Sequence, residues 1–194
     1  MRRMLTQQED VFYYVTLMNE NYAQPSMPEG AAEGILRGMH RVRAAKGAKV
    51  RLLGAGTILN EVLAAAELLE KDWGIAAEVF SVTSFTELRR DGMEHGNWIE
   101  SQLPANGTPV IAACDYVSAL ADLIRPYVPG KYVALGTDGF GRSDTRAALR
   151  DFFEVDAKGI AVAALAALGS PLAADARRRY GYGDAGRAAA PWQR

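Results

Sequence analysis

The sequence predicts an α/β domain in which a mostly parallel sheet of five strands lies between two layers of helices. Short apolar runs alternate with longer stretches of helical spacing along most of the chain. This alternation is typical of strand–helix–strand units with right-handed crossovers. Glycine, proline or a capping residue separates most of these stretches. With 194 residues, of which 49% are hydrophobic, the chain is long enough for one three-layer core.

Five segments are expected to form the sheet, because each is short, apolar and bounded by turn residues. The first alternates apolar and polar side chains, as a half-exposed strand does, and a short basic turn joins it to the second. The third begins soon after Gly74, which is expected to end the helix before it. In chain order the segments are residues 38–43, 50–53, 77–82, 109–113 and 132–135.

The helices are placed by their apolar spacing and by the residues that can cap them. The longest covers residues 58–71, with Thr57 as its cap. Ser84 is expected to cap a helix that runs to Arg90, and Asp156 an alanine-rich helix over residues 157–168. A helical turn is expected over 29–36, further helices over 116–127, 146–153 and 172–180, and a long polar loop over 91–107.

Both ends of the chain differ from this pattern. Residues 11–18, VFYYVTLM, are rich in β-branched and aromatic side chains and predict a strand, and the polar stretch after them is typical of a connector between domains. Residues 181–194 are rich in Gly and Ala and are expected to be mobile. The expected division is a strand and linker left from a preceding domain over residues 1–27, the domain itself over 28–170, and a C-terminal helix and tail over 171–194.

The composition argues against several classes of function. A formal net charge of −1 gives no electrostatic case for binding nucleic acid or an anionic membrane. The start of the chain has no apolar core of signal-peptide length, and the longest apolar run, residues 160–168, is too short to span a bilayer. A cytoplasmic protein is therefore expected. The single cysteine, Cys114, lies in an apolar run and is expected to be a buried structural thiol.

One candidate site follows the second expected strand, where Gly54 and Gly56 suggest a dinucleotide-binding turn. The details argue against that interpretation, because Leu59 stands where the third glycine would be and no acidic residue ends the next strand. Two interpretations stay open for Gly54, Gly56 and Thr57. They form either a helix start whose amides suit a small anion or a simple close-packed turn.

A second candidate follows the fifth expected strand, in the glycine-rich sequence LGTDGFGRSDTR. It is expected to form a loop at the carboxyl edge of the sheet, with Ser143 or Asp144 capping a helix that begins at Thr145. The loop either only closes over the end of the sheet or contacts a ligand or partner. Phe140 either plugs the loop from inside or points outward to a partner domain; an intermediate position nearer the plug is expected, because the flanking glycines let the backbone fold the ring inward. The candidate residues are Gly136, Asp138, Gly139, Phe140, Gly141, Arg142 and Ser143.

No catalytic residue and no metal ligand is assigned from the sequence. His95 beside Glu94 suggests acid–base work, but adjacent residues on a loop need not converge and no third partner is visible. His40 is expected to be a surface or cross-strand residue rather than a ligand.

Four stretches carry a family resemblance: FYYVTLMNENYAQPSMPEG, VRLLGAGTILNEVLAAAELL, EVFSVTSFTELRRDG and LGTDGFGRSDTRAALRDFFEVD. In order, from about Arg3 to Ala164, they closely resemble the C-terminal domain of the homodimeric bacterial pyruvate dehydrogenases, the decarboxylating component of the pyruvate dehydrogenase complex. Such domains are transketolase-like. The resemblance therefore implies a three-layer α/β/α fold for this chain, with a five-stranded mixed sheet whose first strand is antiparallel. Residues 38–43 fit that strand.

The resemblance implies an oxidoreductase that uses thiamine diphosphate and magnesium to decarboxylate pyruvate and passes the acetyl group to lipoamide on dihydrolipoyl acetyltransferase. This chain lacks the GDG motif and later asparagine pair that hold the cofactor, and the preceding domain that supplies the activating glutamate. We therefore expect the chain to bind no cofactor and to be inactive alone. The implied partners are the preceding domains of the same enzyme, its dimer mate and the acetyltransferase complex.

Two functions from different classes follow. The first is a structural and assembly domain of an enzyme, and residues 11–18, without their sheet, are then expected to self-associate or to lie on the chain's own surface. The second is a regulatory module that binds a small anion or nucleotide at the helix starts over residues 54–57 and 136–143.

Overall fold

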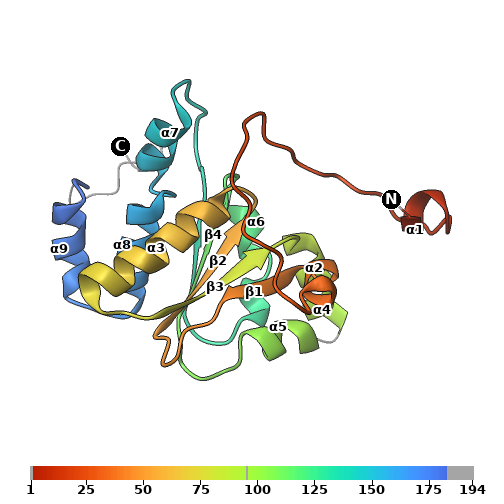
Figure 1. Ribbon diagram of the computed structural model, residues 1–194, viewed down its shortest axis with the longest axis horizontal. Coiled ribbons are helices and arrows are strands. Elements are labelled where there is room, and N and C mark those ends of the chain that lie inside the picture. Colours follow the sequence, from red (N-terminus) through yellow and green to blue (C-terminus); the bar gives the residue numbers. More distant parts are fainter. Residues whose placement is uncertain (1, 95, 183–194) are drawn as a thin grey trace.

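A computed structural model describes residues 2–94 and 96–182 of the chain. Its centre is one sheet with helices on both sides, and the N-terminal residues extend away from it (Figure 1). The strands are β1 (Met39–Arg43), β2 (Val50–Ala55), β3 (Ala77–Val82), β4 (Val110–Ala113) and β5 (Tyr132–Leu135). The α-helices are α1 (Arg2–Leu5), α2 (Ala32–Leu36), α3 (Ile58–Trp73), α4 (Phe85–Glu94), α5 (Asn97–Gln102), α6 (Ser118–Asp122), α7 (Arg146–Phe153), α8 (Ala157–Ala167) and α9 (Leu172–Arg179).

The strand order is β1-β3-β2-β4-β5. β1 pairs antiparallel with β3, whereas β2 pairs parallel with both β3 and β4, and β4 pairs parallel with β5. The five-stranded mixed sheet with an antiparallel first strand is therefore confirmed. His40 faces Ser81 across the β1–β3 pair, which confirms its expected cross-strand position.

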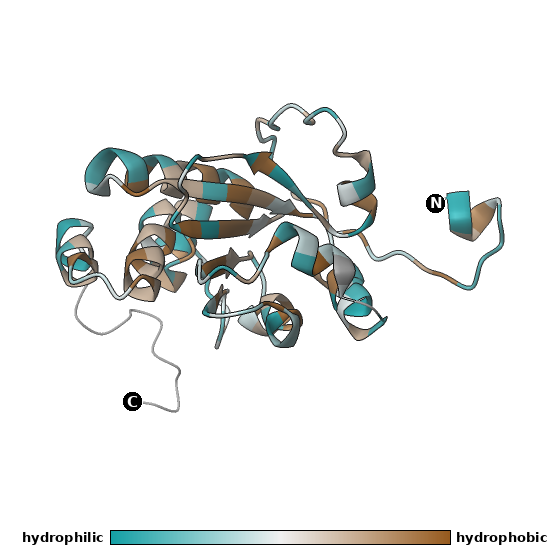
Figure 2. Cartoon of the chain, turned by 90° about the horizontal axis from the view of Figure 1, so that it is seen from below, coloured by the Kyte–Doolittle hydropathy of each residue, from teal (hydrophilic) through white to brown (hydrophobic). Residues whose placement is uncertain are grey.

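Alternating side chains of the central strands feed two separate cores. Val79 of β3 belongs to the core beneath α3 and α8, and its neighbour Phe80 to the core beneath α4, α5 and α6. α9 packs on α8 and contributes Ala176 to the first core. In Figure 2 hydrophobic residues concentrate on the strands between these helix layers. None of the described helices is long and apolar enough to cross a membrane.

Most expected elements are confirmed, and three keep their bounds: β3, β5 and α7. Two predicted caps are present, because Ser84 Oγ accepts a hydrogen bond from the Glu87 amide at 3.1 Å and Asp156 Oδ1 accepts one from the Gly159 amide at 2.8 Å. Gly74 ends α3 in the left-handed conformation, with φ 65°. The division at residues 27 and 170 stays a prediction.

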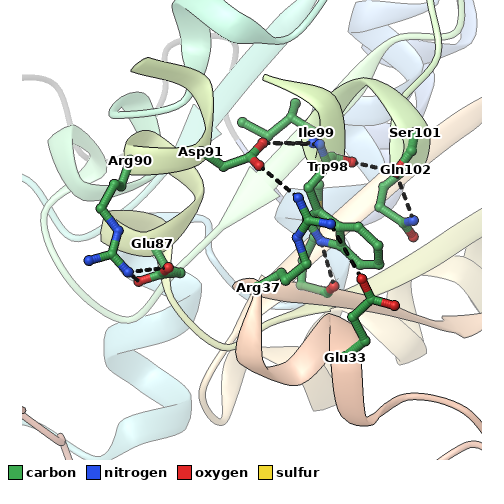
Figure 3. A network of polar contacts seen from close by, with 10 residues as sticks. Glu33, Arg37, Glu87, Arg90, Asp91, Trp98, Ile99, Ser101 and Gln102 are labelled. Atoms are coloured by element: carbon green, nitrogen blue, oxygen red, sulfur yellow. Dashed lines mark hydrogen bonds and ion pairs between the residues drawn. The ribbon is translucent and has the colours of Figure 1, made fainter. Parts of the chain in front are cut away.

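The polar loop expected over residues 91–107 is wrong up to residue 102, because α4 continues to Glu94 and α5 follows it; residues 103–107 lie outside any helix or strand, as expected. The Asp91 carboxylate accepts hydrogen bonds from the amides of Trp98 and Ile99 at 3.1 and 3.3 Å, and from Arg37 Nη2 at 3.2 Å (Figure 3). A side chain on α4 therefore satisfies the first amides of α5. Glu94 is exposed at the end of α4. His95 lies outside the described residues.

The helix expected over residues 116–127 is also wrong in its extent. The structure has the short α6 and then a 3₁₀ turn over Arg125–Tyr127. Pro126 lies at the start of that turn, and a proline lacks the amide that a continuing α-helix requires.

Residues 11–18 form no strand, so that prediction is wrong for this structure. They belong to an extended segment, residues 8–28, that we call the arm (Figure 1). A strand needs a partner edge to satisfy its backbone, and a lone extended segment in water has none. Of the stretch expected to be mobile, residues 181 and 182 are described, and there the expectation is wrong for Tyr182, which is 3% exposed and bonds through its hydroxyl to Asp156. The remaining residues, 183–194, lie outside the described part.

Candidate functional site

Both sequence-predicted loops lie at the carboxyl edge of the sheet, where β2, β4 and β5 end side by side. Residues 56–57 connect β2 to α3, Asp115 follows β4, and residues 136–145 connect β5 to α7. Ligands of open α/β sheets bind at this edge, because loops and helix starts gather there.

The β2–α3 turn is closely packed. A Cβ atom on Gly54 would lie 2.8 Å from Leu59 Cα, so a glycine lets α3 approach the strand. Gly56 has φ 58°, a left-handed conformation that glycine adopts without strain. The Leu59 amide donates to the Gly56 carbonyl at 3.3 Å and the Asn60 amide to the Thr57 carbonyl at 3.1 Å. These amides are engaged within the chain, and ligand binding at this turn stays a prediction.

Thr57 does not cap α3 as expected. Its backbone is already helical, with φ −71° and ψ −17°, and its side chain makes no capping hydrogen bond. Thr57 Oγ1 instead accepts a hydrogen bond from Arg150 Nη2 at 3.0 Å.

The β5–α7 loop is held at its start. A Cβ atom on Gly136 would lie 2.4 Å from Ser118 N and 2.5 Å from Tyr116 O, so the loop crosses the start of α6 in contact with its backbone. The next residue, Thr137, donates its amide to the same Tyr116 carbonyl at 2.8 Å. Asp138 Oδ1 accepts a hydrogen bond from the Ser118 amide at 2.9 Å and thereby caps α6 from a distant loop.

Beyond Asp138 the loop turns outward. Gly139 has φ 91°, and Phe140 is 81% exposed, so the expected position nearer the plug is wrong. The flanking glycines permit either direction, and the position of α7 takes the loop away from the core. Ser143 is exposed, and Thr145 rather than Ser143 or Asp144 caps α7, accepting a hydrogen bond from the Ala148 amide at 3.3 Å.

Arg150 joins the two loops, although the sequence reasoning did not single it out. It is only 8% exposed. Its guanidinium lies 3.2 Å from Glu61 Oε1 on α3 and 3.4 Å from Asp115 Oδ2 after β4, in addition to its bond with Thr57. The signal in the sequence that could have identified Arg150 is its position in α7, between the apolar residues Leu149 and Phe153.

A pocket of about 280 Å³ lies between the β5–α7 loop and α7. Its charged lining consists of the guanidinium groups of Arg142, Arg146 and Arg150 and the carboxylate of Asp115, which already pairs with Arg150. Its apolar lining includes Phe140, Leu149 and Phe153. The pocket therefore combines arginine side chains with aromatic and aliphatic surface.

The arm reaches this pocket from outside. Arg146 Nε lies 2.9 Å from Glu20 Oε1, and Arg146 also donates a hydrogen bond to Asn19. The hydrogen bond from Arg146 lowers the pKa of the Glu20 carboxyl, and that from the Tyr22 hydroxyl lowers it further. The Tyr22 ring lies 5.8 Å from the Arg150 guanidinium. The carboxylate of Glu20, a residue of the same chain, therefore already pairs with Arg146 of the pocket.

The described residues offer little for nucleophilic or metal chemistry. Cys114 is 1% exposed, as expected for a structural thiol, and burial raises its pKa. Among residues 2–94 and 96–182, no group of three or more His, Cys, Asp or Glu residues is arranged to hold a metal ion.

Comparison with known proteins identifies the family of this chain. A family model described as the transketolase-like TK C-terminal domain matches residues 38–156. The pyruvate dehydrogenase E1 component of Pseudomonas aeruginosa is 50% identical over 184 residues, covering 86% of this chain and 21% of the relative. That of Escherichia coli K12 is 49% identical over 175 residues, covering 83% and 20%. The chain thus spans about a fifth of the length of these relatives.

Solved structures give the same fold at lower identity. A transketolase from Pichia stipitis superposes with a TM-score of 0.57 at 20% identity, covering 71% of this chain and 19% of that one. A split-gene transketolase described as an inactive β4 tetramer superposes with a TM-score of 0.51 at 22% identity, covering 68% and 42%. The chain belongs to the family of transketolase-like C-terminal domains, and within it resembles the C-terminal part of bacterial pyruvate dehydrogenase E1 components.

Proposed function

We propose that this chain serves as the C-terminal assembly domain of a thiamine diphosphate-dependent pyruvate dehydrogenase and is not catalytic alone. In this role it holds the preceding domains and the second subunit of a cytoplasmic homodimer. The enzyme would decarboxylate pyruvate from glycolysis and pass the acetyl group to the lipoamide of dihydrolipoyl acetyltransferase. The cofactor and its magnesium ion would be held by the other domains. The observation that carries the proposal is the exposed apolar arm.

The arm exposes more apolar surface than a soluble chain normally leaves in contiguous form. Phe12, Tyr14 and Leu17 are 86%, 88% and 87% exposed, and Val15 between them is 70% exposed. Figure 2 shows hydrophobic residues along this segment, which is extended and has no strand partner in the described chain. An extended apolar segment of this kind suits addition to the edge of another sheet. The arm is therefore proposed as the connection to the preceding domain.

The experiment is a light-scattering measurement on two forms of the chain. The full chain is expected to self-associate, or to protect its arm from protease, because the arm's exposed apolar side chains pair with no strand among the described residues. A form lacking residues 1–24 is expected to remain a folded monomer, because all five strands and both cores lie downstream. A monomeric full chain with protease-sensitive Tyr13 and Tyr14 contradicts the arm's role, and unfolding of the shortened form contradicts the domain boundary.

The absence of independent activity is tested directly. The chain with thiamine diphosphate, magnesium and pyruvate is expected to release no carbon dioxide above background, because the cofactor supplies the chemistry and must be positioned by other domains. The full-length E1 component of Pseudomonas aeruginosa is the positive control. Decarboxylation that scales with the concentration of this chain would contradict the proposal.

A further inference from the structure

We propose that the pocket between the β5–α7 loop and α7 binds a small organic anion, and that Glu20 of the arm competes with this ligand. The phosphate or carboxylate group of the ligand would pair with Arg146, and its apolar part would lie against Leu149 and Phe153. This inference is independent of the assembly role, because it concerns the pocket and a soluble ligand.

The charge of the pocket favours an anion. Arg142, Arg146 and Arg150 line it, and two carboxylates, Asp115 and Glu61, pair with Arg150, so one net positive charge remains once Glu20 is displaced from Arg146. Arg146 and Arg150 are one helical turn apart, so both project from the same face of α7. The planar guanidinium group matches phosphate and carboxylate oxygens in pairs, which makes arginine the residue best suited to recognising either group.

The inner wall of the pocket is preorganised. Arg150 is held by Glu61, Asp115 and Thr57, so it needs no rearrangement to present positive charge. Its Nε atom is buried and has no hydrogen-bond partner among the described residues. A buried donor without a partner is costly, and the contacts of Arg150 with its neighbours keep it in this position.

Glu20 shows how an anion engages the outer arginine. Its carboxylate lies 2.9 Å from Arg146 Nε, although the two residues are separated by most of the domain in sequence. Both side chains contact water, with exposed fractions of 31% for Arg146 and 54% for Glu20. Exposed ion pairs are weak and screened by salt, so a free anion can displace this carboxylate.

The apolar wall limits the size of the ligand. Leu149 and Phe153 of α7 line the pocket, and so does Phe140 of the loop, which is 81% exposed. The volume, about 280 Å³, lies just below the usual range of small-molecule sites, which starts at about 300 Å³. A ligand with one ring and one anionic group fits these walls better than a dinucleotide does.

Calorimetric titration with phenyl phosphate tests the site, with inorganic phosphate and phenol as probes for each half. Phenyl phosphate is expected to bind saturably and at least about tenfold more tightly than either partial probe. Arg146→Gln is expected to weaken its binding about tenfold or more. Arg89→Gln, an exposed arginine on α4, is the matched control and should leave the dissociation constant unchanged. Circular dichroism confirms that each variant is folded.

A second variant tests the competition by Glu20, and here the affinity for phenyl phosphate is expected to rise rather than fall. Glu20→Gln removes the competing carboxylate and is expected to tighten phenyl phosphate binding about threefold. Glu29→Gln changes the net charge equally at an exposed position outside the pocket and serves as its control. The proposal is overturned if phenyl phosphate does not saturate, if Arg146→Gln binds it as tightly as the unmodified chain, or if Glu20→Gln fails to tighten it. None of these results depends on the oligomeric state or on decarboxylation.

Discussion

The β2–α3 turn and the β5–α7 loop use glycine at the same edge of the sheet with opposite results. In the turn, α3 begins within a few residues of β2, and Gly54 makes room for the helix backbone. In the loop, Gly136 fixes the start against α6, and the chain then travels outward before α7 begins. Glycines after a strand therefore do not determine what the connection becomes. The position of the next helix decides whether the connection is a closed turn or an open loop beside a pocket.

Arg150 makes the two regions dependent on each other. It comes from the helix after the open loop, yet its partners Thr57 and Glu61 belong to the closed turn and its helix. Glu61 Oε2 also accepts a hydrogen bond from the first amide of α8, Ala157, at 3.0 Å. Glu61 thus links α3 to α7 through an ion pair and to the start of α8 through a hydrogen bond.

The largest effect is expected at the anchor of the open loop. Gly136→Ala would place a methyl group 2.4 Å from Ser118 N, and both nearest atoms are backbone, which cannot move aside cheaply. Overpacking of this kind costs about 3 kcal/mol of unfolding free energy. Urea denaturation followed by circular dichroism measures it.

The matched control lies in the same loop. Gly141 has no atom within 4 Å of an added Cβ, so Gly141→Ala should change the unfolding free energy by less than about 0.5 kcal/mol. Gly54→Ala should fall between the two, because its nearest contact is longer at 2.8 Å. If Gly136→Ala were as stable as Gly141→Ala, the loop would not be anchored at its start.

A smaller loss is expected when the link between the two regions is cut. Arg150→Met keeps the apolar stem but leaves Glu61 and Asp115 without their shared cation. Breaking a fully buried pair costs about 3–5 kcal/mol, and the partial exposure of both carboxylates reduces this to about 2 kcal/mol. The chemical denaturation midpoint reports the loss.

The exposed Arg89 again supplies the control, and Arg89→Met should stay within about 0.5 kcal/mol of the unmodified chain. Arg150→Met should also loosen the pocket, which protease cleavage within residues 136–145 would reveal. Equal stability of the two variants would mean that α7 is held by its apolar face alone.

The sequence is sufficient for features that depend on neighbours in the chain. The β3 strand can be predicted because its apolar run is bounded by Gly74 and Ser84, and the Ser84 cap because its partner Glu87 lies three residues away. The α5 helix cannot be predicted in this way, because its amides are satisfied by Asp91 on another helix. Local pattern contains no sign of that contact.

The same distinction between local and long-range contacts applies to the candidate site. Glycine at positions 54 and 136 is correctly placed at the carboxyl edge by the strands that precede it. The direction of Phe140 and the burial of Arg150 depend on the docking of α7 against α3, a contact between residues far apart in the chain. The strand expected over residues 11–18 fails for a related reason, since a strand forms only where another edge accepts it.

The smallest effect is expected at the outer part of the open loop. Phe140→Ala should lower the unfolding free energy by less than about 0.5 kcal/mol, because the ring is 81% exposed and its removal leaves no cavity. Phe80, 1% exposed in the core beneath α4 and α6, is the matched aromatic control, and Phe80→Ala should cost about 3–5 kcal/mol. The urea midpoints of the two variants decide between an open loop and a plug. A loss near that of Phe80→Ala would show that the ring packs inward in solution, and the loop would then resemble the closed β2–α3 turn.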